Sequence, residues 1–260
     1  MRLEGRSAII TGAAQGIGLA TAERCAAEGA KLVLADANGA KLREAAKRLR
    51  DGGAPVLEAQ ADVTSAADVA AMIEAALGEY GAIDILVNNA GGSGRANASE
   101  IEAVTDQIWD DVIALNLRST FLCCRAAVPH MKHRGYGRIV NLSSGIARGT
   151  GRVTGTAGAV LPYASAKAGI LGLTFTLAKM VAQSGITVNA VVPGFVLTEP
   201  GARVRNWFDG LPAEAQKALV GRTSMGRAGE PAEIANAIVF LASAEASFVS
   251  GTALEISGAA

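Results

Sequence analysis

The segment SAIITGAAQGIG, residues 7–18, joins a short apolar run to a turn that contains three glycines. The run Ser7–Ile10 is typical of a buried strand, and a helix is predicted from Ile17. Gly12, Gly16 and Gly18 permit a tight turn through which backbone N–H groups can approach an anion, and the helix directs its positive end at the same place. The spacing, GxxxGxG, differs from the GxGxxG dinucleotide fingerprint, and a glycine-rich turn without a ligand is the alternative.

The same unit of strand, turn and helix recurs along the chain. The early strands are continuous apolar runs, so both faces of their sheet should be covered. The alternation predicts an α/β fold, a single doubly wound Rossmann domain over residues 1–260 with a parallel seven-stranded sheet and helices on both faces. We predict strands at Ser7–Ile10, Lys31–Ala35, Pro55–Gln60, Ile83–Val87, Gly137–Leu142, Thr187–Val192 and Ala253–Ile256, and helices at Ile17–Glu28, Ala40–Arg50, Ala66–Glu79, Asp106–His133, Ala164–Gln183 and Pro231–Ala242.

Two stretches interrupt this periodicity, and both follow predicted strands. In an open α/β sheet, such excursions lie at the carboxyl ends of the strands, where ligands bind. We therefore predict two insertions at the active-site edge, a loop over residues 145–162 and a second insertion over residues 198–228.

Composition excludes several classes of function. Lys and Arg total 24, as do Asp and Glu, and no basic block stands out, so nucleic acid is not an expected partner. The N-terminus lacks the apolar run of a signal peptide and no long apolar span follows, which predicts a cytoplasmic protein without a membrane segment. The three cysteines and two histidines (Cys25, Cys123, Cys124, His130, His133) have the spacing of neither a disulfide framework nor a metal site, so no metal is predicted.

Asp36 ends the second predicted strand, eighteen residues beyond Gly18. A carboxylate at that position can accept hydrogen bonds from the adenosine ribose hydroxyls and would repel a 2′-phosphate. No Arg or Lys stands beside it, although Lys41 and Arg43 lie on the following helix. The sequence favours NAD over NADP, with helix capping by Asp36 as the alternative explanation.

Tyr163 and Lys167 lie four positions apart at the start of a predicted helix, so their side chains share one face. A free phenol is a poor base at neutral pH, but a nearby ammonium group lowers its pKa toward the working range. A YxxxK pattern alone is common on helix surfaces. Whether this pair is catalytic therefore depends on the other motifs in the sequence.

When the other motifs are taken together with this pair, the chain resembles the short-chain dehydrogenase/reductase family over nearly its whole length. The motifs that carry the resemblance are TGAAQGIG at 11–18, Asp62, NNAG at 88–91, Asn116, Ser144, YASAK at 163–167, and Pro193-Gly194 with Thr198. Each motif alone is weak, but their order and most of their spacings are specific.

The resemblance implies a role for each matching residue. Tyr163 would act as acid/base on the substrate oxygen, Lys167 would lower the Tyr163 pKa and bind the nicotinamide ribose, and Ser144 would hydrogen-bond the substrate oxygen, with Ser143 as a lesser alternative. Asn116 would hold a water that relays protons to Lys167. The implied cofactor-binding residues are Gly12, Gln15, Gly16, Ile17, Gly18, Asp36, Asp62, Val63, Asn89, Ala90, Gly91, Tyr163, Lys167, Pro193, Gly194, Val196 and Thr198.

The family also implies a substrate region and an assembly. We expect a secondary alcohol or ketone to meet Ser144, Ile146, Tyr163, Phe195 and Trp207. The family implies that the insertion over residues 198–228 is a lid whose apolar face covers the substrate, and an ordinary amphipathic helix packed on the sheet is the alternative. The two longest helices and the last strand imply a homotetramer. Ser144 and Tyr163 are 19 positions apart, several more than the family pattern has. In this longer loop, Arg148, Arg152 or Val153 is a candidate for contact with the substrate or a neighbouring subunit, and a solvated glycine-rich loop is the alternative.

Three functions remain open at this point. The leading one is an NAD-dependent oxidoreductase that transfers a hydride between the cofactor and a secondary alcohol or ketone. A 3-oxoacyl-acyl-carrier-protein reductase would use NADPH, which Asp36 disfavours. A non-catalytic NAD-binding protein would be expected to lack the Tyr163–Lys167 pair.

Overall fold

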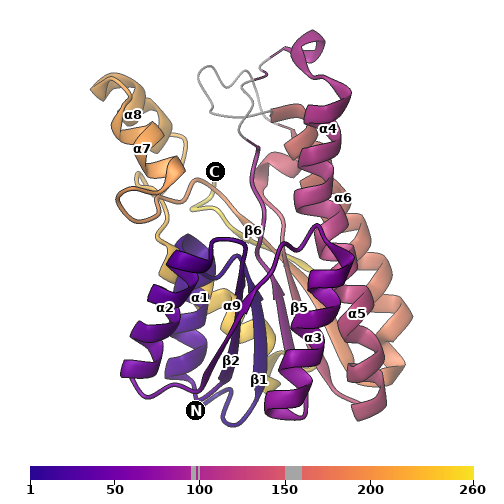
Figure 1. Ribbon diagram of the computed structural model, residues 1–260. Helices are drawn as coiled ribbons and strands as arrows, with labels where there is room; N and C mark the ends of the chain where they lie inside the picture. The colour runs from indigo at the N-terminus through magenta and orange to yellow at the C-terminus, as the bar shows by residue number, and fades with distance from the viewer. Residues whose placement is uncertain (95–97, 99, 150–159) are drawn as a thin grey trace.

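A computed structural model describes residues 1–94, 98, 100–149 and 160–260 (Figure 1). Its seven strands form one parallel sheet in the order β3-β2-β1-β4-β5-β6-β7, which confirms the predicted fold class. Strands β2 and β3 are added on one side of β1, and β4 to β7 follow on its other side, so the strand order reverses between β1 and β4, where Ala8 pairs with Ile85. The strands are β1 (Ser7–Thr11), β2 (Lys31–Asp36), β3 (Val56–Gln60), β4 (Ile85–Asn88), β5 (Gly137–Leu142), β6 (Ile186–Pro193) and β7 (Ala253–Ile256).

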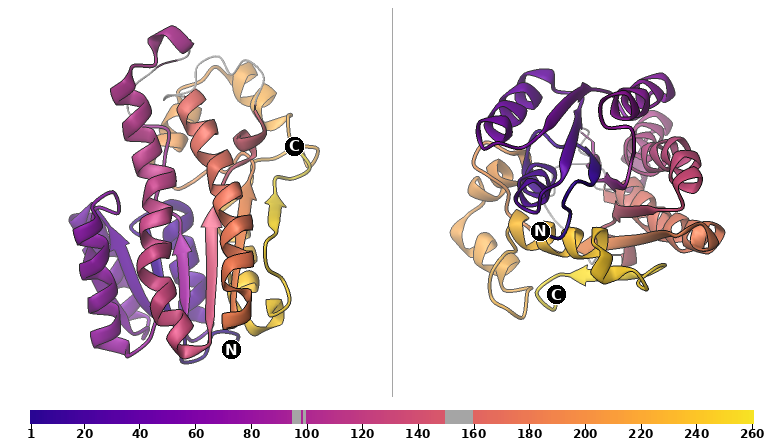
Figure 2. Two further views of the ribbon diagram at one scale, coloured as in Figure 1. Left: turned by 90° about the vertical axis from the view of Figure 1, so that its right-hand side faces the viewer. Right: turned by 90° about the horizontal axis from the view of Figure 1, so that it is seen from below.

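Helices cover both faces of the sheet (Figures 1 and 2). One layer contains α1 (Gly16–Ala27), α2 (Gly39–Asp51) and α9 (Pro231–Ala242). The opposite layer contains α3 (Ala66–Tyr80), α5 (Ser119–Arg134) and α6 (Val160–Val181). Strand residues alternate between these layers: Ile10 packs with the first and Ile9 with the second. This two-sided burial explains why the strands are apolar at successive positions.

The predicted helix over Asp106–His133 is confirmed as one helical stretch, but it is not α-helical throughout. The structure has α4 (Asp106–Ile113), a π-helical turn over Ala114–Arg118, and then α5. The hydroxyls of Ser119 and Thr120 donate to the carbonyl oxygens of Leu115 and Asn116, at 2.7 and 2.8 Å. These bonds stabilise carbonyls in a stretch where the regular i to i−4 pattern is broken.

The predicted start of the next helix is wrong. Helix α6 begins at Val160, four residues before Ala164, so Tyr163 lies in its first turn. Pro162 is compatible with that position because the first N–H groups of a helix have no intrahelical partner.

Two helical stretches, Asp106–Arg134 and Val160–Ser184, are long and apolar enough to cross a membrane by length and mean hydropathy. The sequence had predicted no such span. Helices packed on a core pass the same test, and both stretches contact other elements of this fold. Each also leaves large apolar side chains exposed to solvent: Trp109 and Phe121 on the first, and Leu161, Phe175 and Met180 on the second.

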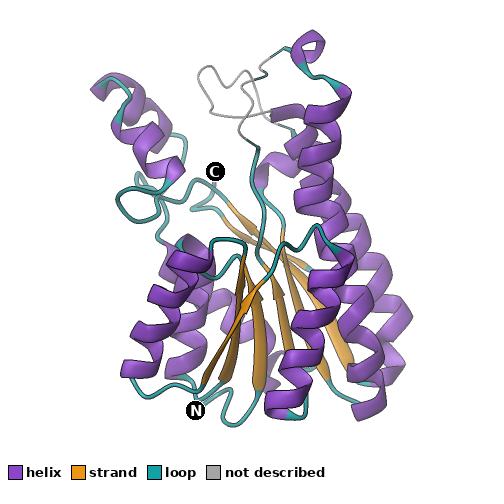
Figure 3. Ribbon diagram, viewed as in Figure 1, coloured by secondary structure: helices purple, strands orange, loops and turns teal. Residues whose placement is uncertain are grey.

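The predicted lid insertion contains two short helices, α7 (Arg203–Asp209) and α8 (Ala213–Val220). Figure 3 shows them standing above the sheet on the side of α1 and α2, apart from the long helices α4 and α6. They follow β6, so they lie at the edge where the parallel strands end.

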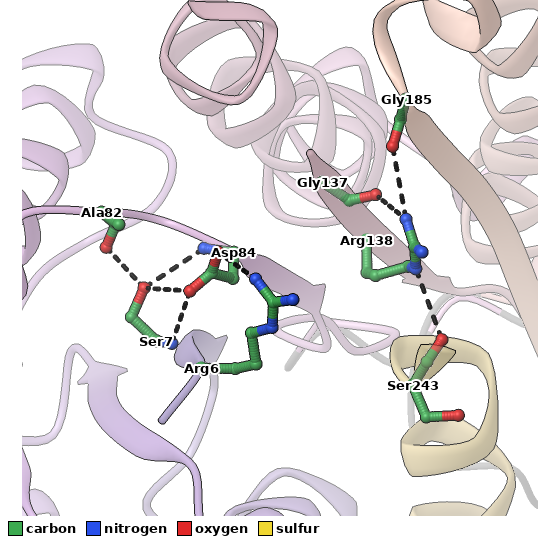
Figure 4. Close-up of polar contacts among 8 residues, drawn as sticks. All are labelled: Arg6, Ser7, Ala82, Asp84, Gly137, Arg138, Gly185 and Ser243. Carbon is green, nitrogen blue, oxygen red and sulfur yellow. Dashed lines mark hydrogen bonds and ion pairs between the residues drawn. The ribbon is translucent and has the colours of Figure 1, made fainter. Parts of the chain in front are cut away.

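Two separate polar clusters lie at the opposite edge, where the strands begin (Figure 4). Asp84 accepts hydrogen bonds from the Ser7 backbone N–H at 3.0 Å and from Arg6 at 3.2 Å. Across the sheet, buried Arg138 donates to the carbonyl oxygens of Gly137, Gly185 and Ser243. These contacts tie β1 to the approach to β4, and β5 to the approach to β6, far from the carboxyl edge.

Replacing Asp84 by Asn is therefore expected to lower the free energy of unfolding by about 2 kcal/mol, because a buried charge-assisted bond is lost. The matched control is Asp51→Asn, which removes the exposed Lys47–Asp51 ion pair and should cost less than about 0.5 kcal/mol. Urea unfolding of the three proteins measures both values. Equal effects would contradict a structural role for the buried edge.

Candidate active site

A cleft of about 960 Å³ opens at the carboxyl edge of the sheet, bounded on one side by the lid. It brings together the glycine-rich turn, the ends of β2, β4, β5 and β6, and the first turns of α6. All the predicted cofactor and substrate residues line it except Gly18. Asn116, predicted as catalytic, does not line it either.

The turn after β1 is built around close backbone approach. Gly12 has φ of 63°, and a Cβ there would lie 2.9 Å from the Cα of Ala90. A Cβ on Gly18 would fall on the carbonyl oxygen of Gly12. Gly18 is thus needed for packing behind the turn, although it does not face the cleft.

The donors of this turn fit an anionic group. The Gly16 N–H, at the start of α1, donates to both carboxylate oxygens of Glu199, at 3.0 and 3.2 Å. That carboxylate stands in for an anion such as a phosphate oxygen at a helix N-terminus. The neighbouring N–H groups of Ile17 and Gly18 meet no acceptor within the described residues.

Thr198 is a second observation that fits a ligand bound in this cleft. Its hydroxyl oxygen is buried and has no hydrogen-bond partner in the described part of the chain. A buried unpaired hydroxyl is costly, so a ligand that provides its partner would stabilise this position. Thr198 also lies beside the turn, because a Cβ on Gly16 would be 3.3 Å from its methyl group.

Asp36 ends β2, three strands across the sheet from β5, whose end meets Lys167. Its two carboxylate oxygens accept from the backbone N–H groups of Ala14, at 3.1 Å, and Asn38, at 2.9 Å. The carboxylate is therefore oriented by the turn that it faces. Lys41, on α2, donates to the side-chain oxygen of Gln15 at 2.7 Å, which places an ammonium group beside the same turn.

Two other predicted residues have structural bonds as well as a place on the cleft. The amide of Asn89 donates to the carbonyl oxygens of Thr11 and Gly12, at 2.9 and 3.0 Å, and holds the end of β4 to the glycine-rich turn. Asp62 accepts from the backbone N–H and hydroxyl of Thr64, at 2.9 and 2.8 Å, which is ordinary turn chemistry.

Tyr163 and Lys167 project from one face of α6 toward the end of β5. The Lys167 ammonium donates to the carbonyl oxygen of Leu142 at 2.8 Å and lies 5.5 Å from the centre of the Tyr163 ring. Only 3% of Lys167 is exposed. This burial lowers the pKa of Lys167 to about 8, since leaving water disfavours the charged form.

The lowered pKa has a consequence for stability. Between about pH 8 and the ordinary value of 10.5, folded Lys167 binds fewer protons than unfolded Lys167, so the wild-type free energy of unfolding gains from rising pH across that window. Lys167→Met lacks this term. The free energy of unfolding of the variant, measured against that of wild type at the same pH, should be most favourable at pH 7. This difference should fall by about 2–3 kcal/mol by pH 10. Denaturant unfolding at both pH values measures the change; a constant difference would mean that Lys167 titrates normally.

The adjacent serines face different ways. Ser144 is half-buried on the cleft, and its hydroxyl oxygen lies 3.4 Å from the Ile146 backbone N–H as acceptor. Ser143 is buried, and its hydroxyl donates to the backbone carbonyl of Lys167 at 2.8 Å. Of the two, Ser144 has the hydroxyl that a substrate oxygen could reach beside Tyr163.

Asn116 lies in the π-helical turn, fully buried behind the cleft. Its amide donates to the carbonyl oxygens of Gly92 and Val112, each at 2.8 Å, and its side-chain oxygen accepts from the Gly92 N–H at 3.0 Å. A Cβ on Gly91 would lie 2.5 Å from that oxygen and 3.1 Å from the Lys167 nitrogen. Asn116, Gly91 and Lys167 are thus in close contact, and a water between Asn116 and Lys167 stays a prediction.

The predicted substrate residues Ile146, Phe195 and Trp207 all line the cleft. The rings of Phe195 and Phe208 lie 5.6 Å apart, which packs α7 of the lid onto the loop after β6. Trp207 lies on the same helix. Arg152 and Val153 fall outside the described residues.

The structure adds cleft residues that the sequence prediction did not include, among them Arg222, Glu255 and Ser257. Arg148, in the inserted loop, forms an ion pair with Glu255 of β7. The signal for Glu255 and Ser257 was available, because they end the last strand of a parallel sheet and belong to the same carboxyl edge. Arg222 follows α8, and nothing in its local sequence indicates the cleft.

Comparison with known proteins agrees with this geometry. The family model described as Enoyl-(Acyl carrier protein) reductase matches residues 12–258. The chain is 39% identical to the (2S)-[(R)-hydroxy(phenyl)methyl]succinyl-CoA dehydrogenase subunit BbsD of Thauera aromatica, over 99% of this chain and 97% of that protein. It is 41% identical to the cis-4-hydroxycyclohexanecarboxylate dehydrogenase of Sinomonas cyclohexanicum, over 97% and 95%.

Among solved structures, levodione reductase superposes with a TM-score of 0.89 at 36% identity, covering 99% of this chain and 98% of that one. Fold, motif order and full-length similarity therefore agree. The chain belongs to the short-chain dehydrogenase/reductase family of oxidoreductases.

Proposed function

We propose that the protein transfers a hydride between NAD(H) and a secondary alcohol or ketone. One observation carries this proposal: a single cleft holds the anion-binding turn and Asp36 together with Tyr163, Lys167 and Ser144. Nucleotide recognition and acid/base groups in one cleft are what such a reaction needs.

The chain's own residues divide the binding of the dinucleotide. The turn from Gly12 to Gly18 would hold the pyrophosphate, Asp36 the adenosine ribose, Asp62 and Val63 the adenine, and Asn89–Gly91 the groove between them. The loop from Pro193 to Thr198 would hold the nicotinamide. When bound, the dinucleotide accepts or donates the hydride.

The acid/base residues handle the proton. In oxidation, Tyr163 as phenolate takes the proton of the substrate hydroxyl, and the Lys167 ammonium favours that phenolate. In reduction, Tyr163 and Ser144 donate hydrogen bonds to the developing oxyanion. Asn116 would hold the water that returns protons to Lys167.

NAD is the proposed cofactor rather than NADP. Asp36 presents a carboxylate at the adenosine end, and a 2′-phosphate there would be repelled. Lys41 at that end supplies a positive charge, which would attract the 2′-phosphate and so favour NADP. We infer that the carboxylate dominates, because its two backbone bonds hold it in place whereas Lys41 is exposed.

The substrate class is a cyclic or hydroxyacyl secondary alcohol, or the corresponding ketone. Ile146, Phe195 and Trp207 give the cleft an apolar wall. Two relatives support the class, because their names describe a hydroxyl on a carbon next to a ring and a hydroxyl on a ring.

A second candidate is reduction of a 3-oxoacyl group on acyl-carrier protein with NADPH. A relative in Vibrio cholerae whose name is 3-oxoacyl-[acyl-carrier-protein] reductase, 36% identical over 99% of this chain, favours it. Asp36 disfavours NADPH. A measured preference for NAD or NADP would therefore distinguish the NAD-dependent oxidoreductase from the NADPH-dependent 3-oxoacyl reductase.

Assembly and location complete the proposal. We propose a homotetramer in the cytoplasm, free of membrane and nucleic acid. The exposed Trp109, Phe121, Phe175 and Met180 on the long helices would be covered by a neighbouring subunit. A monomeric mass in light scattering would reject the tetramer.

The decisive experiment follows NAD⁺ reduction over a panel of cyclic and hydroxyacyl secondary alcohols, with NADP⁺ in parallel. We expect turnover with NAD⁺ at least about ten-fold faster in kcat/KM, which corresponds to about 1.4 kcal/mol of discrimination. Preference for NADP⁺ with acyl-thioester substrates would favour the second candidate. Binding of NADH without turnover of any alcohol or ketone would favour the non-catalytic alternative.

A further inference from the structure

The end of β5 makes two separate contacts with Lys167. The carbonyl oxygen of Leu142 accepts from the side-chain ammonium, and the hydroxyl of the next residue, Ser143, donates to the backbone carbonyl, both at 2.8 Å. The last residue of β5 and the residue that follows it thus hold the side chain and the backbone of one lysine. Both contacts are buried.

The Ser143 contact is not needed to satisfy the helix. A carbonyl inside an α-helix already accepts a bond from the N–H four residues further on. The hydroxyl of Ser143 adds a bond to this carbonyl from outside the helix. What it adds is a fixed relation between α6 and the end of β5, at the residue whose side chain must reach back to the strand.

A second tether of the same kind strengthens this reading. The amide of Asn141, on β5, donates to the Thr174 hydroxyl at 2.9 Å, and that hydroxyl donates to the carbonyl of Ile170 at 2.7 Å. Asn141 and Ser143 share one face of the strand, and Lys167 and Thr174 share one face of the helix, two turns apart. Two contacts on matching faces oppose both sliding and rotation of α6.

Lys167 has no room to adapt if α6 moves. Gly91 approaches from the other side, where even a methyl group would come within 3.1 Å of the Lys167 nitrogen. Gly169 meets Leu117 so closely that a Cβ there would lie 2.7 Å from the Leu117 side chain. The lysine is therefore enclosed by β5, the loop after β4 and the π-helical turn.

We propose that Ser143 is a positioning residue: its hydroxyl fixes the backbone of Lys167 so that the ammonium meets both Leu142 and Tyr163. Ser143 also lines the cleft, but its hydroxyl is turned to the Lys167 carbonyl and acts through Lys167 rather than on a substrate oxygen. This inference deepens the proposed function, because it assigns a role around the same acid/base pair. It also separates the two adjacent serines, one toward the substrate and one toward the helix.

Loss of the hydroxyl should act on Tyr163 through Lys167. When the ammonium is held less firmly beside the ring, the phenolate is stabilised less, and the Tyr163 pKa rises. Alcohol oxidation depends on the phenolate, so the acidic limb of its pH profile should move to higher pH. Cofactor affinity should change little, because the glycine-rich turn, Asp36 and Thr198 are untouched and Lys167 would supply only one of the contacts to the dinucleotide.

The test compares Ser143→Ala with Ser7→Ala. Ser7 is an equally buried serine whose hydroxyl donates to the Ala82 carbonyl at the far edge of the sheet, so its replacement tests stability alone. Kinetics would use NAD⁺ and the best alcohol, with NADH affinity and thermal midpoint measured for each protein. Tyrosine ionisation would also be followed by ultraviolet difference against Tyr163→Phe, which isolates Tyr163 without any turnover.

We expect Ser143→Ala to lower kcat on the order of ten-fold at pH 7, in line with a small misplacement of a catalytic group. Its acidic limb and its Tyr163 ionisation midpoint should both rise by about half a pH unit. NADH affinity should stay within about two-fold of wild type. Ser7→Ala should lower the thermal midpoint and leave kcat, the acidic limb and the Tyr163 midpoint at wild-type values.

Three results would overturn the proposal. They are an unchanged Tyr163 midpoint in Ser143→Ala, the same rise in Ser7→Ala, or a loss of turnover as complete as that of Tyr163→Phe, which would make Ser143 a group that touches substrate. Failure of the proposed function looks different, because wild type would then turn over no alcohol. The ultraviolet titration still decides the role of Ser143 in that case.

Discussion

Tyr163→Phe is expected to lower kcat for alcohol oxidation by about 10³-fold, because the substrate proton loses its acceptor in the transition state. The ring itself is kept, so the packing of α6 against the cleft should survive. NADH should bind with nearly unchanged affinity, since the glycine-rich turn, Asp36 and Thr198 are intact. Steady-state kinetics and fluorescence titration with NADH measure the two effects separately.

The matched control for this variant is Tyr136→Phe. Tyr136 lies at the far edge of the sheet, where its ring is stacked against the guanidinium groups of Arg6 and Arg138, at 4.0 and 4.4 Å. Loss of its hydroxyl should leave kcat within about two-fold of wild type. If Tyr163→Phe retained wild-type turnover, another group would have to act as the base, and the proposed mechanism would fail.

Gly91→Ala is expected to lower kcat by about 10²-fold although Gly91 takes no part in the chemistry. The added Cβ would lie 2.5 Å from the side-chain oxygen of Asn116 and 3.1 Å from the Lys167 nitrogen. Asn116 cannot move away easily, because its amide is bonded to Gly92 and Val112. The displacement should therefore reach Lys167, and through it Tyr163.

Gly172→Ala is the control for Gly91→Ala. Gly172 lies on α6, five residues beyond Lys167, and a Cβ there would meet nothing within 4 Å. This change should leave kcat unchanged and raise the free energy of unfolding by about 0.5–1 kcal/mol, because Ala favours the helix. Kinetics and denaturant unfolding of both variants test the pair. Equal kcat values for the two would show that the contact around Gly91 is loose.

Much of this architecture could be predicted because it follows from local physics. Continuous apolar runs mark β1 and β2 as strands buried on both faces, and each was placed within one residue of its observed end. The glycines of the first turn could be interpreted because their backbone requirement is local. Tyr163 and Lys167 could be predicted as an acid/base pair because they belong to a series of motifs that spans the chain.

The remaining features depend on contacts that no local pattern encodes. The π-helical turn at Asn116 arises where side-chain hydroxyls replace regular helical bonding, and nothing in ALNLR requires it. The different directions of Ser143 and Ser144 depend on where α6 lies. The contact of Glu199 with Gly16 joins residues 183 positions apart, as only the folded chain can do.

The place of β1 in the sheet also governs how the molecule can be made. β1 pairs with β2 early, Ser7 beside Lys31, but its other neighbour is β4, where Ala8 meets Ile85. A ribosome adds about 5–20 residues each second, so a nascent chain carries β1 with one open edge for several seconds before β4 emerges. An unpaired edge in that interval can recruit another strand. β1, an interior strand of the finished sheet, is thus an edge strand for part of its synthesis.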